Sequence, residues 1–349
     1  FYHIQKYLVA PATMPEHLVW FKWESYMTWL SGFTLMVLVY YLGSEFYLID
    51  PEVMNLAPWQ AILISVVSLA FGWLVYDQIC KRFVNSNQTL VMIALFVVLV
   101  GMSYFYASVF TGRAALIHLG AWTATIMSAN VFFVIMPNQR VVVADLQAGR
   151  KPDPKYGKIA KQRSTHNNYL TLPVIFMMLS NHYPLAFATQ HTWIIASLVF
   201  LMGVTIRHYF NSNHARTGNP TWTWAVTAVI FILIMWLSVA PALRAEEDVA
   251  ALPPSVARFA QAEEFPDVFN AVAGRCSMCH SDYPGYPGIN WAPHGLRLET
   301  EAQVARAARL IYLQAGRAHA MPPANVSWME PDERDLIVRW YQGVTQERG

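Results

Sequence analysis

The sequence predicts an all-α protein in which a polytopic transmembrane helical bundle precedes a small helical C-terminal domain. Of its 349 residues, 55% are hydrophobic and 13% are charged, whereas soluble proteins carry about 25% charged residues. The apolar residues are gathered in runs of about 20, the helix length that crosses the hydrocarbon core of a bilayer. These runs stop before residue 245. The lipid bilayer is therefore the expected partner of the first two thirds of the chain.

Seven runs reach the required length, and each is predicted to form one transmembrane helix. They cover residues 26–46, 59–79, 90–110, 114–136, 168–188, 191–210 and 222–243. The fifth run is the least regular, because Pro173, Asn181 and His182 interrupt it. One such run alone is also typical of a buried helix in a soluble protein, but seven in succession indicate a membrane domain.

The distribution of basic residues predicts the topology. Segment 137–167 is predicted to be a loop, and it carries seven basic residues against two acidic ones, Asp145 and Asp153. Because loops rich in lysine and arginine stay in the cytoplasm, this loop is predicted to be cytoplasmic. Seven crossings from a cytoplasmic N-terminus then place the C-terminal residues outside. We expect a multi-pass protein of the bacterial inner membrane with its C-terminal domain in the periplasm.

The chain begins at Phe1, without an initiator methionine or a signal peptide pattern. Residues 1–25 resemble an internal loop, so we expect one more span upstream and eight spans in the full protein. After the last apolar run comes an acidic, proline-bearing segment from Glu246 to Pro254. We therefore predict a transmembrane domain, a linker and a C-terminal domain over residues 1–244, 245–262 and 263–349.

The C-terminal domain contains two cysteines that are separated by two residues and followed at once by a histidine: Cys276-Ser277-Met278-Cys279-His280. This is the attachment pattern of a c-type haem, whose vinyl groups react with the two thiols while the histidine ligates the iron. A zinc half-site would need a second ligand pair, and Cys80 is the one cysteine that remains. A redox dithiol would need a βαβ setting, which the sequence lacks. We expect a covalent haem c.

Met321 is predicted to be the second iron ligand. It precedes two prolines, which hold an extended and rigid segment, and histidine–methionine ligation raises the haem potential. Helices predicted around residues 266–274, 301–315 and 331–343 complete a small, class I-like cytochrome c domain. The alternative ligands are Met329, His294 and His319.

Ionisable and amide side chains inside the predicted spans form two groups by depth, and such groups are costly in lipid unless they serve a cavity or cofactor. The outer group could hold a b-type haem between paired histidines, and the inner group offers donors and acceptors for a polar planar substrate. Anchoring at the headgroups and helix capping are the alternatives. The outer group is His118, His182 and His191, and the inner group is His166, Asn167, Asn168, Arg207 and His208.

Several motifs together resemble one known family. With the C-terminal cytochrome, they are similar to the bacterial membrane-bound urate oxidase (urate hydroxylase) family over essentially the whole chain. The CxxCH motif is specific for haem c but not for this family, so the membrane motifs carry the resemblance. These motifs are His166-Asn167-Asn168-Tyr169, Ser180-Asn181-His182-Tyr183-Pro184, and the segments from Tyr2 to Tyr7 and from Trp20 to Tyr26.

The resemblance implies oxidation of urate to 5-hydroxyisourate in purine catabolism, with water as the source of the new hydroxyl group. Electrons would leave through haem c to the respiratory chain, by a soluble cytochrome c or a terminal oxidase, rather than to oxygen. Our hypothesis from the chemistry is that His166 or His208 removes a proton from urate or from water. Arg207 would counter the charge of the urate anion.

Two other classes of function remain open. The membrane histidines suit a respiratory subunit that oxidises quinol or another donor and carries a tethered cytochrome c. A transporter or sensor is the third alternative, although polar residues near the span ends do not favour transport. A net charge of +2 without a basic patch interleaved with aromatic residues gives no indication of nucleic-acid binding.

Overall fold

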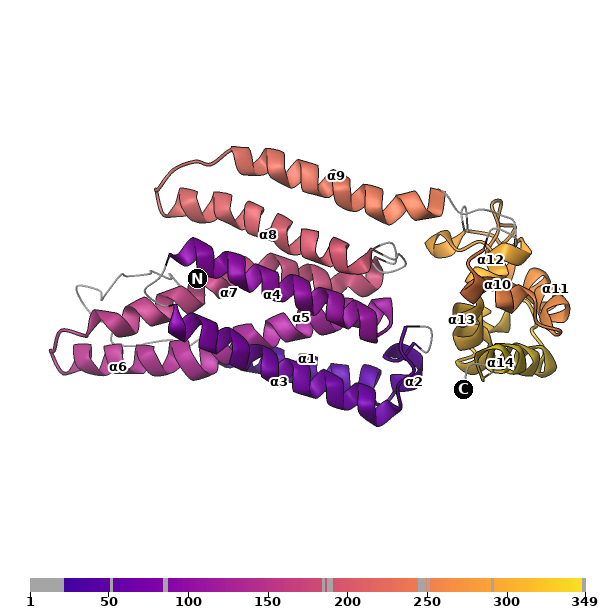
Figure 1. Cartoon of the computed structure of the whole chain (residues 1–349), viewed down its shortest axis with the longest axis horizontal. Coiled ribbons are helices and arrows are strands. Elements are labelled where there is room, and N and C mark those ends of the chain that lie inside the picture. The colour runs from indigo at the N-terminus through magenta and orange to yellow at the C-terminus, as the bar shows by residue number, and fades with distance from the viewer. Residues whose placement is uncertain are drawn as a thin grey trace. The chain divides into compact units, whose positions relative to one another are not determined.

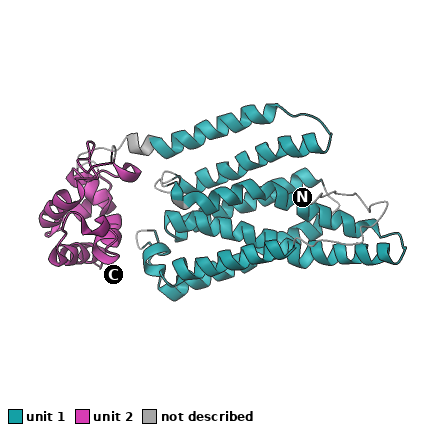
Figure 2. Cartoon of the chain, turned by 180° about the vertical axis from the view of Figure 1, so that it is seen from behind, with its two compact units in different colours: residues 1–241 teal, residues 242–349 magenta. Residues whose placement is uncertain are grey.

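The computed structural model describes residues 22–50, 53–83, 87–183, 186, 191–243, 249, 252–289 and 292–346. The chain divides into two compact units, residues 1–241 and 242–349, which Figure 2 shows in two colours. We call them unit 1 and unit 2. The described residues of both units form helices and no strands, which confirms the predicted all-α class.

Unit 1 consists of long helices that run along one another (Figure 1). A π-helical stretch, Asn130–Ile135, joins α5 to α6 without a break, and another, Val37–Tyr41, continues α1. The helices are α1 (Lys22–Met36), α2 (Ser44–Tyr47), α3 (Pro58–Arg82), α4 (Gln88–Val109), α5 (Gly112–Ala129), α6 (Met136–Gln147), α7 (Pro154–Leu179), α8 (Thr192–His214) and α9 (Trp222–Leu243).

Five of the described helical segments are long and apolar enough to cross a membrane. Each overlaps a predicted span, and apolar side chains such as Leu63, Phe71 and Leu90 are exposed on their surfaces, as lipid-facing helices require. The predicted runs 26–46 and 168–188 are not among them, so the count of seven spans stays a prediction. The five segments are Pro58–Arg82, Gln88–Val109, Gly112–Gln147, Thr192–His214 and Trp222–Val239.

The prediction of a loop over residues 137–167 is wrong. Helix α6 continues the preceding span to Gln147, and α7 starts at Pro154, so six residues lie between the two helices. Asp153 caps α7 by accepting a hydrogen bond from the backbone N–H of Lys155 at 2.9 Å. Hydropathy marks the apolar part of a helix and not its full length, so the polar ends of both helices were assigned to a loop.

The helix predicted at 168–188 also has different bounds, because α7 ends at Leu179 and is followed by a 3-10 turn over Ser180–His182. Pro173 lies inside α7 without ending it. Its ring packs against Gly203 of α8, where a Cβ atom would lie 2.6 Å from the ring carbons. A glycine at position 203 therefore lets the two helices approach each other at the proline.

One end of unit 1 brings together the end of α4, the start of α5, the start of α8 and the end of α9. Ser103 of α4 donates to the carbonyl of Trp193 at 2.9 Å. Helices α8 and α9 are antiparallel neighbours, joined by the Thr205 and Thr227 hydroxyls at 2.9 Å (Figure 1). We call this end the α9 exit end, because the chain continues from it into unit 2.

Unit 2 is built around the buried indole of Trp340, whose Nε1–H donates to the carbonyl of Phe259 at 2.9 Å. Phe265 and Tyr341 pack beside it. The helices predicted around 266–274 and 331–343 are present with slightly longer bounds, whereas the helix predicted at 301–315 is divided at Ala307 into two short α-helices and a π-helical stretch. The α-helices of unit 2 are α10 (Pro254–Ala260), α11 (Phe265–Cys276), α12 (Glu301–Arg306), α13 (Ala308–Ile311) and α14 (Pro331–Gln346), and π-helical residues Tyr312–Arg317 continue α13.

Candidate functional site

A cluster of polar side chains is buried inside unit 1, where α3, the α5–α6 junction and α7 meet. Buried polar groups destabilise a fold unless they are paired, and inside a membrane protein they usually mark function. We call this group the Tyr76–His166 cluster. Its members are Tyr76, Asp77, Asn130, Arg163, His166 and Asn167.

The amide groups determine which partner donates in the centre of the cluster. Asn167 Nδ2 donates to the carbonyl of Met127 at 2.9 Å, so its Oδ1 is the acceptor that faces Asn130. Asn130 Nδ2 donates to that Oδ1 and to the Tyr76 hydroxyl oxygen, each at 3.0 Å. The Tyr76 hydroxyl and His166 Nδ1 lie 2.8 Å apart. We assign the phenol as the donor in this contact, which places the proton of neutral His166 on Nε2.

A buried ion pair forms the second half of the cluster. Arg163 Nη2 lies 2.7 Å from Asp77 Oδ1, and the two side chains are 2% and 4% exposed. The guanidinium also lies over the Tyr76 ring, 5.0 Å from its centroid. Lys81, with an exposed side chain, contacts the other carboxylate oxygen at 2.7 Å. Two cations therefore share one carboxylate, which leaves an excess of positive charge beside His166.

Three buried polar atoms near this level of the bundle have no hydrogen-bond partner. They are Asn168 Oδ1, Arg163 Nε and Arg207 Nε. Each buried group that stays unpaired costs about 1–3 kcal/mol. Two donors and one acceptor are therefore available to a polar ligand, which would pair them on binding.

The predicted inner group is only partly brought together. His166 and Asn167 belong to one cluster, whereas His208 Nδ1 contacts the Tyr169 hydroxyl at 3.1 Å. Sequence reasoning missed Tyr76, Asp77 and Arg163. A signal existed for Asp77, because it is the one acidic residue in the apolar run 59–79.

The predicted outer histidines occupy different environments. His118 is fully buried, its Nδ1 bonds to the carbonyl of Ala114 at 2.8 Å, and its Nε2 has no partner. The ring centroids of Phe110, Tyr40 and Tyr106 lie 4.8, 5.6 and 5.9 Å from the His118 centroid. His182 is exposed in the turn after α7, and His191 is half-buried at the start of α8. A membrane haem b stays a prediction.

In unit 2 the predicted haem-binding residues share the end of α11. The backbone N–H groups of Cys279 and His280 both donate to the carbonyl of Cys276, at 3.1 and 2.9 Å. His280 Nδ1 lies 2.9 Å from the carbonyl of Leu296. Since a carbonyl only accepts, Nδ1 carries the proton and Nε2 keeps its lone pair. Two thiols within one turn and a histidine with a free Nε2 fit the requirements of a covalent haem.

The pKa of the half-buried Cys276 thiol is raised to about 11. Burial is the main cause, the nearby Cys279 and Glu333 add to it, and Arg334 opposes them. The thiol is therefore protonated at neutral pH, a state in which it is a weak nucleophile.

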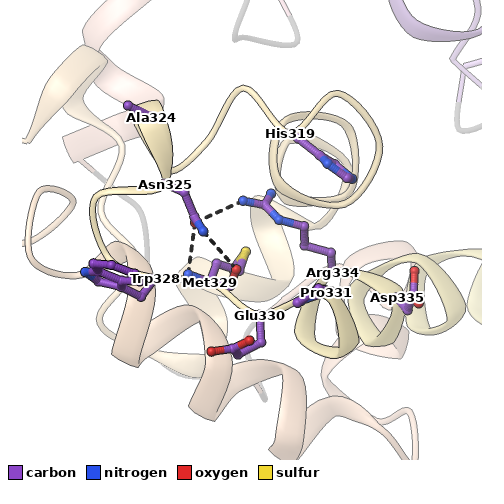
Figure 3. Close-up of a pocket in the computed structure, with 9 residues that line it drawn as sticks. All are labelled: His319, Ala324, Asn325, Trp328, Met329, Glu330, Pro331, Arg334 and Asp335. Carbon is purple, nitrogen blue, oxygen red and sulfur yellow. Dashed lines mark hydrogen bonds between the residues drawn. The ribbon is translucent and has the colours of Figure 1, made fainter.

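Met321 is 36% exposed and belongs to a loop that one arginine holds. The buried guanidinium of Arg334 donates to the carbonyls of Ala315 and Met321 at 2.6 and 2.9 Å. It also donates to Asn325 Oδ1 at 3.2 Å. This loop and α14 border a cavity of about 530 Å³, shown in Figure 3.

The alternative ligands differ in their surroundings. His319 lines that cavity (Figure 3), Met329 lines it but is 2% exposed within the core, and His294 is exposed. Met321 therefore has an accessible side chain, while its backbone carbonyl is held by a hydrogen bond from Arg334. The role of Met321 stays a prediction.

The fold and the site define a class: an all-helical protein with helices able to cross a membrane and a buried polar cluster between them. The urate oxidase N-terminal family matches residues 1–238 of the 349, and the chain belongs to that family. The match includes every residue of the Tyr76–His166 cluster. No curated protein and no solved structure matches the chain.

Proposed function

We propose that this protein oxidises urate to 5-hydroxyisourate within the membrane and passes the electrons through a covalent haem c to the respiratory chain. The observation that carries the proposal is the buried Tyr76–His166 cluster, which lies inside the segment that belongs to the urate oxidase family. The reaction removes two electrons: urate and one water give 5-hydroxyisourate, two protons and two electrons.

The charges of the cluster suit urate as an anion. Arg163 and Lys81 outnumber the single carboxylate of Asp77, and a surplus cation in a site of low dielectric constant stabilises a bound anion. Arg207 adds a half-buried arginine side chain whose Nε is buried and has no partner among the described residues. The ring N–H groups and carbonyl oxygens of urate would pair with Asn168 Oδ1 and with these arginine donors.

His166 is the side chain best placed to handle a proton. Its Nε2–H is a donor toward substrate, and its basic Nδ1 faces the Tyr76 hydroxyl. Because His166 Nδ1 contacts the Tyr76 hydroxyl, a proton released in the reaction reaches this nitrogen through that hydroxyl. His208 is the second candidate base, held by Tyr169.

The residues of unit 2 would hold the electron acceptor. Cys276 and Cys279 would form the two thioether bonds, His280 Nε2 would ligate the iron on one side and Met321 on the other. The haem, when bound, supplies an acceptor that takes one electron at a time. A periplasmic position of unit 2 in a bacterial inner membrane completes the proposal, with a soluble cytochrome c or a terminal oxidase as the next acceptor.

The test is an anaerobic titration of the haem-loaded full chain with urate, followed by the haem absorption spectrum. Urate is expected to reduce the haem without oxygen. The variant His166→Ala should lose this reduction, whereas His214→Ala, a change at an exposed histidine of α8, should keep it. Reduction by a quinol and not by urate would overturn the assignment of substrate and favour a quinol-oxidising subunit.

A further inference from the structure

We propose that Tyr76 and Trp122 form a redox relay that carries electrons singly from the urate site toward the α9 exit end of unit 1. The inference rests on the proposed function and assigns a path to its electrons. It depends on three observations. Tyr76 contacts His166 through a hydrogen bond, and the buried indole of Trp122 packs on Gly72, one helical turn before Tyr76 on α3. A group of aromatic rings around His118 lies nearer the α9 exit end.

The pairing of Tyr76 with His166 suits reversible oxidation of a phenol. A tyrosine becomes far easier to oxidise when its proton can move to a base in the same step. The Tyr76 oxygen lies 2.8 Å from His166 Nδ1 and also accepts a hydrogen bond from Asn130, so with the phenol assigned as donor its proton lies on the contact with His166. Movement of the proton to His166 as the electron leaves keeps the charge change small, which matters at a buried position.

Trp122 is positioned as the next electron carrier. Its indole packs directly on Gly72 of α3, where a Cβ atom would collide with the indole Nε1. Gly72 lies four residues before Tyr76 on the same helix, an axial separation of about 6 Å. The indole is buried and its Nε1 has no acceptor, so an oxidised Trp122 keeps its proton and exchanges only an electron.

Between Trp122 and the α9 exit end lies a group of aromatic rings around His118. His118 lies one turn earlier on α5 and contacts Tyr106 and Phe110, at centroid distances of 5.9 and 4.8 Å. The Tyr106 hydroxyl reaches back to Ser68 of α3 at 2.8 Å. From Asn130 to His118 the helix rises about 18 Å. Since electron transfer slows steeply with distance, an intermediate carrier at Trp122 divides a long transfer into short ones.

Each cycle of the relay balances. Trp122 gives up one electron toward the aromatic group at the exit end, and the c-type haem of the proposed function, when bound, would accept it. Tyr76 replaces that electron while its phenolic proton moves to His166. Urate then gives one electron to the Tyr76 oxygen, which takes its proton back. Two cycles remove two electrons, and the two protons lost by urate and water pass to solvent.

The test compares Trp122→Phe with Trp122→Tyr in the haem-loaded full chain. Both changes remove the indole, and neither replacement can be oxidised easily at this position: the phenyl ring is inert, and a phenol needs a base for its proton, whereas the described residues offer no partner to Trp122 Nε1. Both variants should therefore slow reduction of the haem by urate at least about tenfold. Trp73→Phe on α3 and Tyr104→Phe on α4, changes at aromatic residues outside the relay, are the matched controls.

Two further measurements do not rely on the rate of haem reduction. Rapid freezing followed by electron paramagnetic resonance should trap an indole radical in the wild-type protein and none in Trp122→Phe. Urate binding by calorimetry should be unchanged in both Trp122 variants, which shows that the substrate site is intact.

The outcomes separate the two proposals. If urate does not reduce the haem of the wild-type protein, the proposed function and the relay both fall. If Trp122→Phe is reduced as fast as the wild type, the relay is overturned and the function stands. Slowing in both variants without an indole radical in the wild-type protein would also overturn the relay, because the indole would then matter for its shape and not for its oxidation.

Discussion

Arg163 and Asp77 form an ion pair across 2.7 Å in the interior of unit 1, although they are 86 positions apart in the sequence. Neither charge is accessible to water, so each depends on the other for its stability. The pair fixes α7 against α3 and holds the guanidinium over the ring of Tyr76. The same ion pair therefore stabilises the bundle and positions Arg163 beside Tyr76 in the candidate site.

Removal of one partner should be far more damaging than removal of both. Asp77→Asn leaves the buried Arg163 without its counter-charge, and we expect a loss of about 3–5 kcal/mol in the free energy of unfolding. The double variant Asp77→Asn/Arg163→Met should recover part of that loss. Thermal unfolding in detergent measures both.

The control is Lys81→Gln, since the exposed Lys81 pairs with the same carboxylate and exposed pairs contribute at most about 1 kcal/mol. A loss at Lys81 as large as that at Asp77 would contradict the buried pair as the stabilising interaction.

Gly72→Ala should destabilise unit 1 through a steric clash with Trp122. A methyl group at position 72 has no room beside the indole, and overpacking of this kind costs about 1–3 kcal/mol. Gly101→Ala is the matched control, because position 101 on α4 has nothing within 4 Å of an added Cβ. In the double variant Gly72→Ala/Trp122→Leu the clash disappears, so its loss should be smaller than the sum of the two single losses. If the loss in the double variant equals the sum of the two single losses, residues 72 and 122 do not contact each other.

Attachment of the haem should require both Cys276, the last residue of α11, and Cys279 in the turn that follows, and not the third cysteine of the chain. The double variant Cys276→Ala/Cys279→Ala is expected to lose all haem after denaturation and solvent extraction, while Cys80→Ala, a change in unit 1, keeps it. A pyridine haemochrome spectrum of the extracted polypeptide measures this. Colour retained by the double variant would refute covalent attachment at this motif.

The sequence predicted the haem motif because its residues are neighbours in the chain. Cys276, Cys279 and His280 lie within one turn, so their spacing in the sequence is enough to predict that their side chains lie close together. The Tyr76–His166 contact joins residues 90 positions apart. Hydropathy placed α3 but only the second half of α7, because His166 lies in the segment predicted as a loop, and it gave no information on which faces the two helices turn toward each other. The residues of the polar cluster therefore became apparent only from the packing of α3 against α7.

The helix boundaries show the same limit. An apolar run measures the part of a helix that suits lipid, and the polar ends of α6 and α7 extend beyond it. The segment 137–167 was therefore predicted as a loop on its charge. Trp122 illustrates a different limit, because its role depends on the absence of a side chain at Gly72, and no pattern within either helix indicates that contact.

Arg334→Gln should loosen the segment that carries Met321 without unfolding unit 2. The guanidinium fixes the carbonyls of Ala315 and Met321 and the amide of Asn325 at once, and a glutamine cannot reach all three. If Met321 ligates the iron, the variant should show a weaker sulfur-to-iron charge-transfer band and a lower reduction potential, because the thioether raises that potential. Arg339→Gln, at an exposed position of the same helix, is the control and should leave both unchanged. An unaltered spectrum and potential in Arg334→Gln, together with the same result for Met321→Ala, would assign the sixth ligand elsewhere, with His319 beside the cavity as the next residue to substitute.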